Sequence, residues 1–440
     1  MSIINGSSSA DTIFGTDGGD AIYPMGGADT VDARSGDDTI YLADDDGALS
    51  WGAHYDGGAG FDTIDASAAT KNVHIVSSGT PTFGFPVTTV SNVEHILTGN
   101  GANIVVMFFA TQSLMIETGS GNDILMGGSV NDTLDGGPGK DTAAYFSMYR
   151  AATISGQNDT RTVLSPIGGR DTLKCIEYIA FKDGMLISDP DSVAGQAVRA
   201  YNAILGRDPN SAELDKAVGD QAHGATIETS VAELARSRDP FGIYSQISNE
   251  DFLNGLYSGL LGRVGDGAGR NFWTSAMEAG GSRAAVLVGF LESTEYKALH
   301  ADQMTADYFV TDEASKYVAA LYDAMAERLP DEQGFTNWVA KLKTGMLTED
   351  GVAKAFSESR EWHSLTDGLS NSALVDYMYN TALNRSAEPE GHSYWLAALD
   401  SGMSDADLLK AFAMAQEHLD EIAPNITGGI NVMSDPFSGF

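Results

Sequence analysis

The stretch Asn5–Leu42 reads NGSSSADTIFGTDGGDAIYPMGGADTVDARSGDDTIYL, and in it an acid followed two positions later by a branched apolar residue recurs every nine residues. The four acids of this register are Asp11, Asp20, Asp29 and Asp38. The residues before each acid are mostly Gly, Ser and Ala. A period of nine is neither the helical period of about 3.6 nor the alternation of a single strand, so the segment is interpreted as a structural repeat.

A six-residue turn followed by a three-residue strand accounts for the period, and two such units make one coil. The turns then alternate between two edges, so that Asp11 and Asp29 share one edge and Asp20 and Asp38 share the other. We expect the branched residues to fill a thin core, which suits β-branched side chains. One turn position is held by glycine, where we expect a positive φ: Gly18, Gly27 and Gly36.

Stacked acids of this kind need a counter-charge. Neighbouring strands lie roughly 4.8 Å apart, so two carboxylates on adjacent coils repel each other unless a cation lies between them. Ca²⁺ prefers oxygen ligands at about 2.4 Å, which short Asp side chains and Gly carbonyls can supply. The sequence therefore predicts calcium sites at the edges of the coils, with these candidate ligands in the first block: Asp11, Asp20, Asp29, Asp38, Gly18, Gly27 and Gly36.

The same register returns further along the chain. It occurs once in GGAGFDTID (57–65) and three times, nine residues apart, between 119 and 144. The additional candidate metal ligands are Asp62, Asp123, Asp132, Asp141, Gly121 and Gly139. Asp123 and Asp141 are expected to share an edge, whereas Asp132 has no expected partner, because Leu114 and Arg150 lie at the positions one coil away. In SNVEHILTGNGANIV (91–105), Asn103 stands where a further Asp is expected.

This pattern resembles the RTX (repeats-in-toxin) nonapeptide, Gly-Gly-x-Gly-x-Asp-x-apolar-x. The resemblance implies a calcium β-roll, a parallel β-solenoid, in a secreted bacterial protein. It also implies export through the type I secretion machinery, with an uncleaved signal that we expect in the tail 426–440. A Gly-rich acidic linker is the alternative, and two separate nine-residue registers argue against it.

Composition limits the other possibilities. The 440 residues have a formal net charge of −36 and a pI near 4.3, which disfavours nucleic acid and anionic membranes as partners. The first 190 residues contain 21 Asp, 3 Glu and 27 of the 50 Gly, whereas residues 191–440 mix Asp and Glu as helical proteins do. A domain boundary is therefore expected near residue 190. No apolar run is long enough to insert into a membrane, and no N-terminal signal segment precedes the repeats.

A second, longer repeat fills residues 191–425, and it predicts an all-α helical repeat domain. Each of four copies has a Tyr six residues before an Arg, at Tyr201/Arg207, Tyr257/Arg263, Tyr322/Arg328 and Tyr379/Arg385. In the last three copies a Gly and a Trp follow that Arg by six and ten residues: Gly269/Trp273, Gly334/Trp338 and Gly391/Trp395. The first copy is degenerate, with Ala217 at the Trp position. Each copy is predicted to form three helices, with Asp266 and Asp331 as N-caps.

These helical copies resemble a domain family of unknown function that is often found beside RTX repeats. The resemblance implies no chemistry. Its Trp and Arg residues are interpreted as core and ion-pair residues, and exposed aromatic faces that bind sugars are the alternative. The whole chain is thus predicted to be a multidomain β + α protein.

No common catalytic motif occurs in the sequence: His-Glu-x-x-His, Gly-x-Ser-x-Gly, a phosphate loop and Cys-x-x-Cys are all missing. We therefore expect a non-catalytic, extracellular, calcium-dependent structural or adhesive protein, such as a surface-layer or matrix component. Its expected partners are calcium, the secretion machinery, and either further copies of itself or a cell-surface polysaccharide. The alternatives are an extracellular glycan-binding protein and a secreted polysaccharide-active enzyme.

Overall fold

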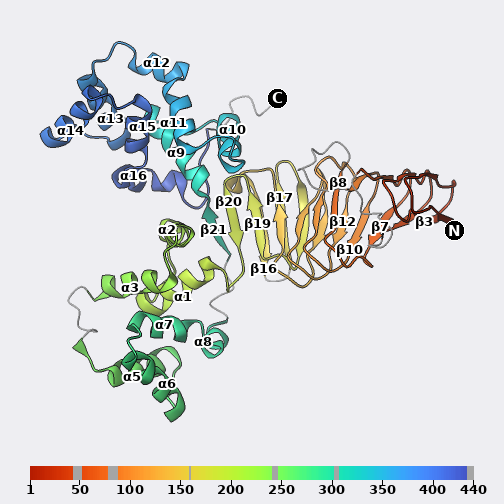
Figure 1. Cartoon of the computed structure of the whole chain (residues 1–440), viewed down its shortest axis with the longest axis horizontal. Coiled ribbons are helices and arrows are strands. Elements are labelled where there is room, and N and C mark those ends of the chain that lie inside the picture. Colours follow the sequence, from red (N-terminus) through yellow and green to blue (C-terminus); the bar gives the residue numbers. More distant parts are fainter. Residues whose placement is uncertain (43–51, 78–87, 158–159, 240–245, 302–306, 434–440) are drawn as a thin grey trace. The chain divides into compact units, whose positions relative to one another are not determined.

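The computed structural model describes residues 1–42, 52–77, 88–157, 160–239, 246–301 and 307–433. The chain divides into two compact units, Met1–Asp189 and Pro190–Phe440. The first unit consists of β-strands and the second almost entirely of helices (Figure 1).

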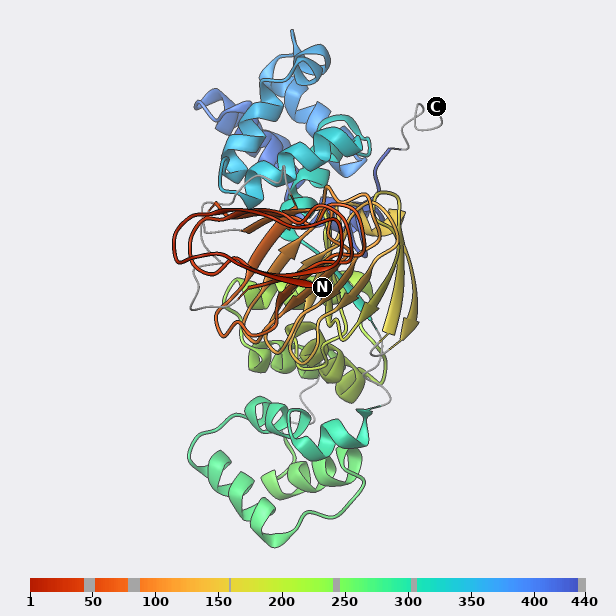
Figure 2. The ribbon, with the colours of Figure 1, turned by 90° about the vertical axis from the view of Figure 1, so that its right-hand side faces the viewer.

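The first unit is a roll of two parallel sheets, and successive strands alternate between them except at β8 and β9, which pair with each other in one sheet. One sheet has the order β1 (Ser2–Asn5), β3 (Asp20–Tyr23), β5 (Thr39–Tyr41), β7 (Thr63–Ala66), β10 (His95–Thr98), β12 (Met115–Glu117), β14 (Thr133–Asp135). The other has the order β2 (Thr12–Phe14), β4 (Thr30–Asp32), β6 (His54–Asp56), β9 (Thr88–Ser91), β8 (His74–Ser77), β11 (Ile104–Val106), β13 (Ile124–Met126), β15 (Thr142–Ala144). Figure 2 looks along the roll from its N-terminal end and shows the first coils as flattened loops.

Two nonapeptides make one coil, as the sequence predicts. Ile13 pairs with Val31 in one sheet, and Ile22 pairs with Ile40 in the other. The apolar residue of each triplet points into the space between the sheets: Ile22, Val31, Ile40 and Ile64 are at most 1% exposed. A core only one side chain deep on each sheet is enough because every coil buries its apolar residues against the coils above and below it.

The roll ends in antiparallel strands. In the first sheet β14 is followed by β18 (Gly169–Lys174), β17 (Thr160–Ser165) and β16 (Thr153–Gln157), and the last two pairings are antiparallel. In the second sheet β19 (Tyr178–Phe181) pairs antiparallel with β20 (Gly184–Ile187). This closing segment delays the next coil, so that β14 pairs with a strand almost forty residues further on.

The second unit contains four similar groups of helices and one four-residue strand, β21 (Tyr308–Thr311). The groups are α1 (Val193–Leu205), α2 (Ser211–Ala222), α3 (Ile227–Arg238); α5 (Asn249–Leu260), α6 (Gly267–Glu278), α7 (Arg283–Leu291), α8 (Thr294–Leu299); α9 (Glu313–Ala326), α10 (Glu332–Lys343), α11 (Glu349–Ser357), α12 (Arg360–Thr366); and α13 (Asn371–Leu383), α14 (Pro389–Asp400), α15 (Asp405–Ala413), α16 (Gln416–Ile426). Among the described residues no helix has the length and apolar character needed to cross a bilayer.

The prediction of three helices in each copy is wrong for the last three copies, which have four. The third predicted helix is divided in all three, and in the second and third copies Ser293 and Ser359 cap the new helix. Their hydroxyls accept hydrogen bonds from the backbone N–H groups of Tyr296 and Trp362, both at 3.1 Å. The predicted N-caps are confirmed: the carboxylates of Asp266 and Asp331 accept from the N–H groups three residues on, at 2.8 and 2.7 Å.

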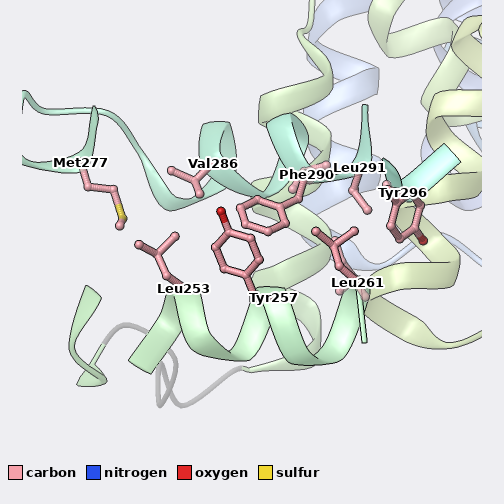
Figure 3. Close-up of a cluster of buried hydrophobic side chains, with 11 residues drawn as sticks. Leu253, Tyr257, Leu261, Met277, Val286, Phe290, Leu291 and Tyr296 are labelled. Atoms are coloured by element: carbon pink, nitrogen blue, oxygen red, sulfur yellow. The ribbon is translucent and has the colours of Figure 1, made fainter. Parts of the chain in front are cut away.

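The repeated Tyr, Arg and Trp residues form one recurring packing motif. In the second copy the Tyr257 ring contacts Phe290 edge-on, with the ring centroids 4.9 Å apart (Figure 3). The Arg263 guanidinium lies 5.0 Å from the centroid of the same Tyr ring and pairs with Glu295. The third and fourth copies repeat this arrangement with Tyr322/Phe356 and Arg328/Glu361, and with Tyr379/Phe412 and Arg385/Glu417. These residues therefore hold each copy together.

Two tryptophans of the third copy allow a matched test of this core. Trp362 is 1% exposed and its Nε1 donates to Asp405 at 3.2 Å, whereas Trp338 is half-buried. We expect Trp362→Ala to lower the free energy of unfolding by about 3–5 kcal/mol, and Trp338→Ala by clearly less. Chemical unfolding of the full chain in chelator, followed at the helical circular dichroism band, measures both. Equal losses would contradict the conclusion that Trp362 contributes more to the stability of this core than Trp338 does.

Candidate functional site

The acids at the edges of the roll form hydrogen-bonded ladders. The backbone N–H of each acid donates to the Oδ1 atom of the acid one coil further on. These contacts join Asp11 to Asp29 (2.8 Å), Asp20 to Asp38 (2.6 Å) and Asp123 to Asp141 (2.8 Å). The three shared edges predicted from the sequence are therefore confirmed.

The ladders are longer than the nine-residue register shows. The Asp38 N–H donates to Asp62 at 2.8 Å, 24 positions on, and the Asp62 N–H donates to Glu94 at 2.8 Å, 32 positions on. The Asp141 N–H donates in the same way to Glu177 at 2.8 Å. Sequence reasoning missed both glutamates, although each begins a triplet of the repeat, Glu-x-Ile with Ile96 and Ile179.

The expectation that Asp132 lacks a partner on its edge is wrong. Its N–H donates to Oδ1 of Asp171 at 2.9 Å, 39 positions on, and its own Oδ1 accepts from Leu114 at 2.7 Å. The expected spacing fails because β16 and β17 are inserted before the next coil begins. Asp171 also starts a repeat triplet, Asp171-Thr-Leu173, which is the feature of the sequence that could have identified it.

The second carboxylate oxygen divides the turns into two kinds. In the first kind, protein donors satisfy Oδ2. Ser7 donates to Asp11 from its backbone N–H (2.6 Å) and its hydroxyl (2.7 Å), and Thr16 does the same to Asp20 (2.6 and 2.9 Å). The Gly128 N–H donates to Asp132 at 2.7 Å. Such a turn satisfies its carboxylate without a metal.

In the second kind, Oδ2 is buried and has no hydrogen-bond partner among the described residues. This holds for Asp29, Asp38, Asp62, Asp123 and Asp141. Four of these five turns have a left-handed residue four positions before the acid: Met25 (φ 69°), Arg34 (φ 72°), Gly58 (φ 91°) and Gly137 (φ 72°). In the satisfied turns, the residue four positions before the acid is Ser7, Thr16 or Gly128, and its backbone N–H donates to Oδ2. A left-handed Met and Arg are unusual, and such backbone strain is typical of binding sites.

The pKa values of the acids depend on burial as well as on the donors, since burial also raises the pKa of the satisfied Asp132 to about 6. Burial raises the pKa of Asp62 to about 7, and the charges of Asp38 and Glu94 add to the effect. Burial likewise raises the pKa of Asp141 to about 7, with Asp123 and Glu177 adding to it. The pKa of Asp20 is instead lowered, chiefly by the backbone N–H of Thr16. An ionised carboxylate is therefore unfavourable in the unsatisfied turns unless a cation neutralises it.

Asn103 shows what an unsatisfied turn needs. Its Oδ1 accepts from the Val73 N–H at 2.9 Å, as an Asp of the ladder does. Its Nδ2 donates to the carbonyls of Gly99 (2.9 Å) and Gly101 (3.1 Å), four and two positions earlier. The amide thus places two N–H donors where an aspartate turn presents only oxygens. This turn is complete without a metal.

The five unsatisfied turns fit a hard cation. No three His, Cys, Asp or Glu side chains converge on one point in the described ranges, so a metal here would be held by one or two carboxylates together with backbone carbonyls. Calcium accepts such an all-oxygen set. The orphaned Oδ2 atoms offer it a negative ligand with no competing proton donor. Metal ligation stays a prediction for all eight acids, and for Asp11, Asp20 and Asp132 it requires existing hydrogen bonds to break.

The glycines of the repeat allow the coils to approach each other. A Cβ added at Gly139 would lie 1.5 Å from the carbonyl oxygen of Gly121, and one at Gly121 would lie 2.0 Å from that of Gly101. Gly27 and Gly36 have the expected positive φ, at 130° and 120°. The same expectation for Gly18 is wrong, because its turn is of the satisfied kind, and a Cβ there would meet nothing within 4 Å.

Known families match both parts of the chain. Residues 5–40, 20–47 and 116–143 match the RTX calcium-binding nonapeptide repeat (4 copies). Residues 234–300, 302–366 and 362–422 match the Domain of unknown function (DUF4214). The chain therefore carries RTX repeats, which bind Ca²⁺, followed by copies of this helical domain, and Ala217 of the degenerate copy lies outside the matches. No curated protein matches the chain.

Exchanging Asn and Asp within one ladder tests the two kinds of turn. Asn103→Asp replaces two donors by a buried carboxylate oxygen, so in chelator we expect it to destabilise the roll by about 2–4 kcal/mol. Calcium should recover most of this loss. Asp123→Asn is the matched reverse change, and it should raise the melting temperature in chelator while reducing the gain from calcium. Thermal melts of both variants with and without calcium measure this, and an Asn103→Asp loss that calcium does not alter would contradict it.

The raised pKa values predict how the metal-free roll responds to pH. Asp62 and Asp141 titrate near pH 7 when folded and near pH 4 when unfolded, so the folded chain binds more protons between these values. The stabilisation that these two carboxyl groups give in their protonated form is complete below about pH 4 and is lost as the pH rises through 7. In chelator the roll should therefore melt at a higher temperature at pH 5 than at pH 8, and calcium should shrink the difference. A roll that gains stability from pH 5 to 8 in chelator would refute this.

Proposed function

We propose that this chain is a secreted, calcium-dependent structural or adhesive protein of the bacterial surface, a surface-layer or matrix component. The observation that carries the proposal is that five buried carboxylate oxygens at the edges of the roll have no donor among the described residues. A fold with this defect is more stable where calcium is available. Calcium therefore acts as a structural element of the protein.

Calcium dependence suits a protein that works outside the cell. Extracellular calcium sites bind at roughly 10⁻⁴–10⁻³ M, far above the calcium concentration of a cytosol. The first unit would be least stable inside the cell, where a secretion channel can thread it, and would become fully stable on reaching the calcium of the exterior. Export through the type I machinery, with the signal in the tail 426–440, is part of this proposal. Most of that tail, residues 434–440, lies outside the described residues.

Self-association is supported by an apolar cluster on the surface of the roll. Phe109, Phe146 and Ile167 are 52%, 47% and 44% exposed. The Phe108 ring joins them, with centroids 5.0 Å from Phe109 and 4.8 Å from Phe146. Grouped exposed aromatic residues mark interaction sites more often than single ones do. Bound calcium would also offset part of the charge of −36, which otherwise keeps copies apart.

The absence of catalysis is also part of the proposal. The comparisons identify no catalytic domain, and the motif that places Tyr, Arg and Trp in the helical copies is explained by packing. The paired acids of the roll are explained by the ladder and its cations. A repetitive scaffold of this kind favours repeated contacts with a partner over a single reaction centre.

The apolar cluster can be tested by substitution. With calcium near 1 mM, within the extracellular range, the wild-type chain should associate in sedimentation velocity or bind to washed cells, and in chelator it should do neither. Phe109→Ser combined with Phe146→Ser should weaken association at least about tenfold, as loss of interface anchors does. Phe14→Ser, which removes a ring that is 54% exposed elsewhere on the roll, is the control and should have little effect. A wild-type chain that stays monomeric in calcium and binds no cells would remove the basis for a structural role.

A further inference from the structure

The degenerate first helical copy contains a cavity of about 340 Å³. Residues of α1, α2, α3 and the α1–α2 turn line it, among them Tyr201, Leu205, Ala217 and Leu234. Ala217 follows Arg207 by ten residues, the position that Trp273, Trp338 and Trp395 hold in the other copies. The cavity therefore surrounds the position where the other copies carry an indole.

The other copies show what is missing. Trp273 packs against Phe290 with centroids 5.5 Å apart, and Trp338 against Phe356 at the same distance. Leu234 follows Ala217 by 17 residues, the spacing of Phe290 from Trp273. The first copy has thus replaced both rings of this pair with smaller side chains. A cavity opened by two substitutions at one contact would cost stability if it had no compensating use.

Polar and charged side chains line the rim of the cavity. Glu213 stands where the other copies have Gly269, Gly334 and Gly391, and it accepts two hydrogen bonds from Arg207, both at 2.7 Å. The Lys216 ammonium pairs with Asp220 on the same helix. Ser230, Glu233 and Ser237 complete the lining from α3. The cavity combines an apolar floor of Tyr201, Leu205, Ala217 and Leu234 with a rim of hydroxyl and charged groups.

Charge and polarity restrict the ligand. The lining has three carboxylates, Glu213, Asp220 and Glu233, against the two cations Arg207 and Lys216, and both cations are already paired. An anionic ligand such as a phosphate or a uronic acid is therefore disfavoured. A wholly apolar ligand would cover the polar rim without satisfying it, which is unfavourable. The volume is at the lower end of the range of about 300–1,000 Å³ for small-molecule sites, which suits one or two rings.

We propose that this cavity binds one uncharged hexopyranose residue of a polysaccharide. A pyranose has an apolar C–H face for the Tyr201 and leucine floor, and hydroxyls at its edge for Glu233 and the serines. The inference rests on the proposed attachment to the cell surface, since it names the chemistry of the partner. The cavity belongs wholly to the helical unit, so its binding does not require calcium.

The test is saturation-transfer NMR of the full chain with the methyl glycosides of glucose, mannose and galactose. At least one glycoside should give a signal, equally in calcium and in chelator. Ala217→Trp restores the missing indole and should weaken binding at least about tenfold, as loss of a matched pocket surface does. Ala222→Trp adds the same ring at an exposed position of α2 outside the cavity and is the matched control. Glu233→Ala removes an exposed rim acceptor without altering the core and should also weaken binding.

Each outcome is decisive. No signal with any of the three glycosides, or a signal that Ala217→Trp and Glu233→Ala leave unchanged, overturns the proposal. Binding of free indole without binding of a glycoside also overturns it and identifies the cavity as a site for an aromatic side chain. Loss of calcium-dependent association with intact glycoside binding would refute the structural role and leave this pocket standing.

Discussion

A buried carboxylate oxygen with no donor is the constraint on which the first unit depends. Each coil of the roll places an acid at its edge, and the ladder contact uses only one of its two oxygens. The second oxygen of Asp29, Asp38, Asp62, Asp123 and Asp141 is buried without a partner. Leaving such a group unpaired costs more than an ordinary hydrogen bond contributes. Calcium, a proton or a rearranged turn must therefore compensate for it.

The turns of this chain avoid the unpaired oxygen in different ways. Ser7 and Thr16 rearrange the first two turns so that backbone and hydroxyl donors reach the acid. At Asn103 the side-chain amide itself supplies the N–H donors, which bind the carbonyls of Gly99 and Gly101. The five turns with an unpaired oxygen keep the acid and depend on the cation, and two of them have left-handed backbone at Met25 and Arg34. The roll thus alternates between segments that are stable alone and segments that need calcium. Its stability therefore depends on the calcium concentration, although some local structure remains without calcium.

Sequence periodicity could predict the roll because a period of nine is incompatible with helices, and because Ile22, Val31 and Ile40 must share one core. It could also predict the three edges, since coils of eighteen residues place equivalent acids one above the other. It could not show whether a hydrogen-bond donor reaches the second carboxylate oxygen, because that depends on the backbone conformation of the turn before each acid. Asp171 was missed because an inserted hairpin shifts the register, and Glu94 because the residue type changes. In the helical unit, the substitution at Ala217 was visible, but the cavity it leaves depends on Leu234 and Glu213 across the copy.

The most direct measurement is a crystal structure of the full chain grown in calcium, with anomalous difference maps that locate the ions. The account predicts peaks beside the second oxygens of Asp29, Asp38, Asp62, Asp123 and Asp141, and none at Asn103. Ions bound at Asp11 and Asp20, with the five buried oxygens left without a cation or a donor, would contradict it.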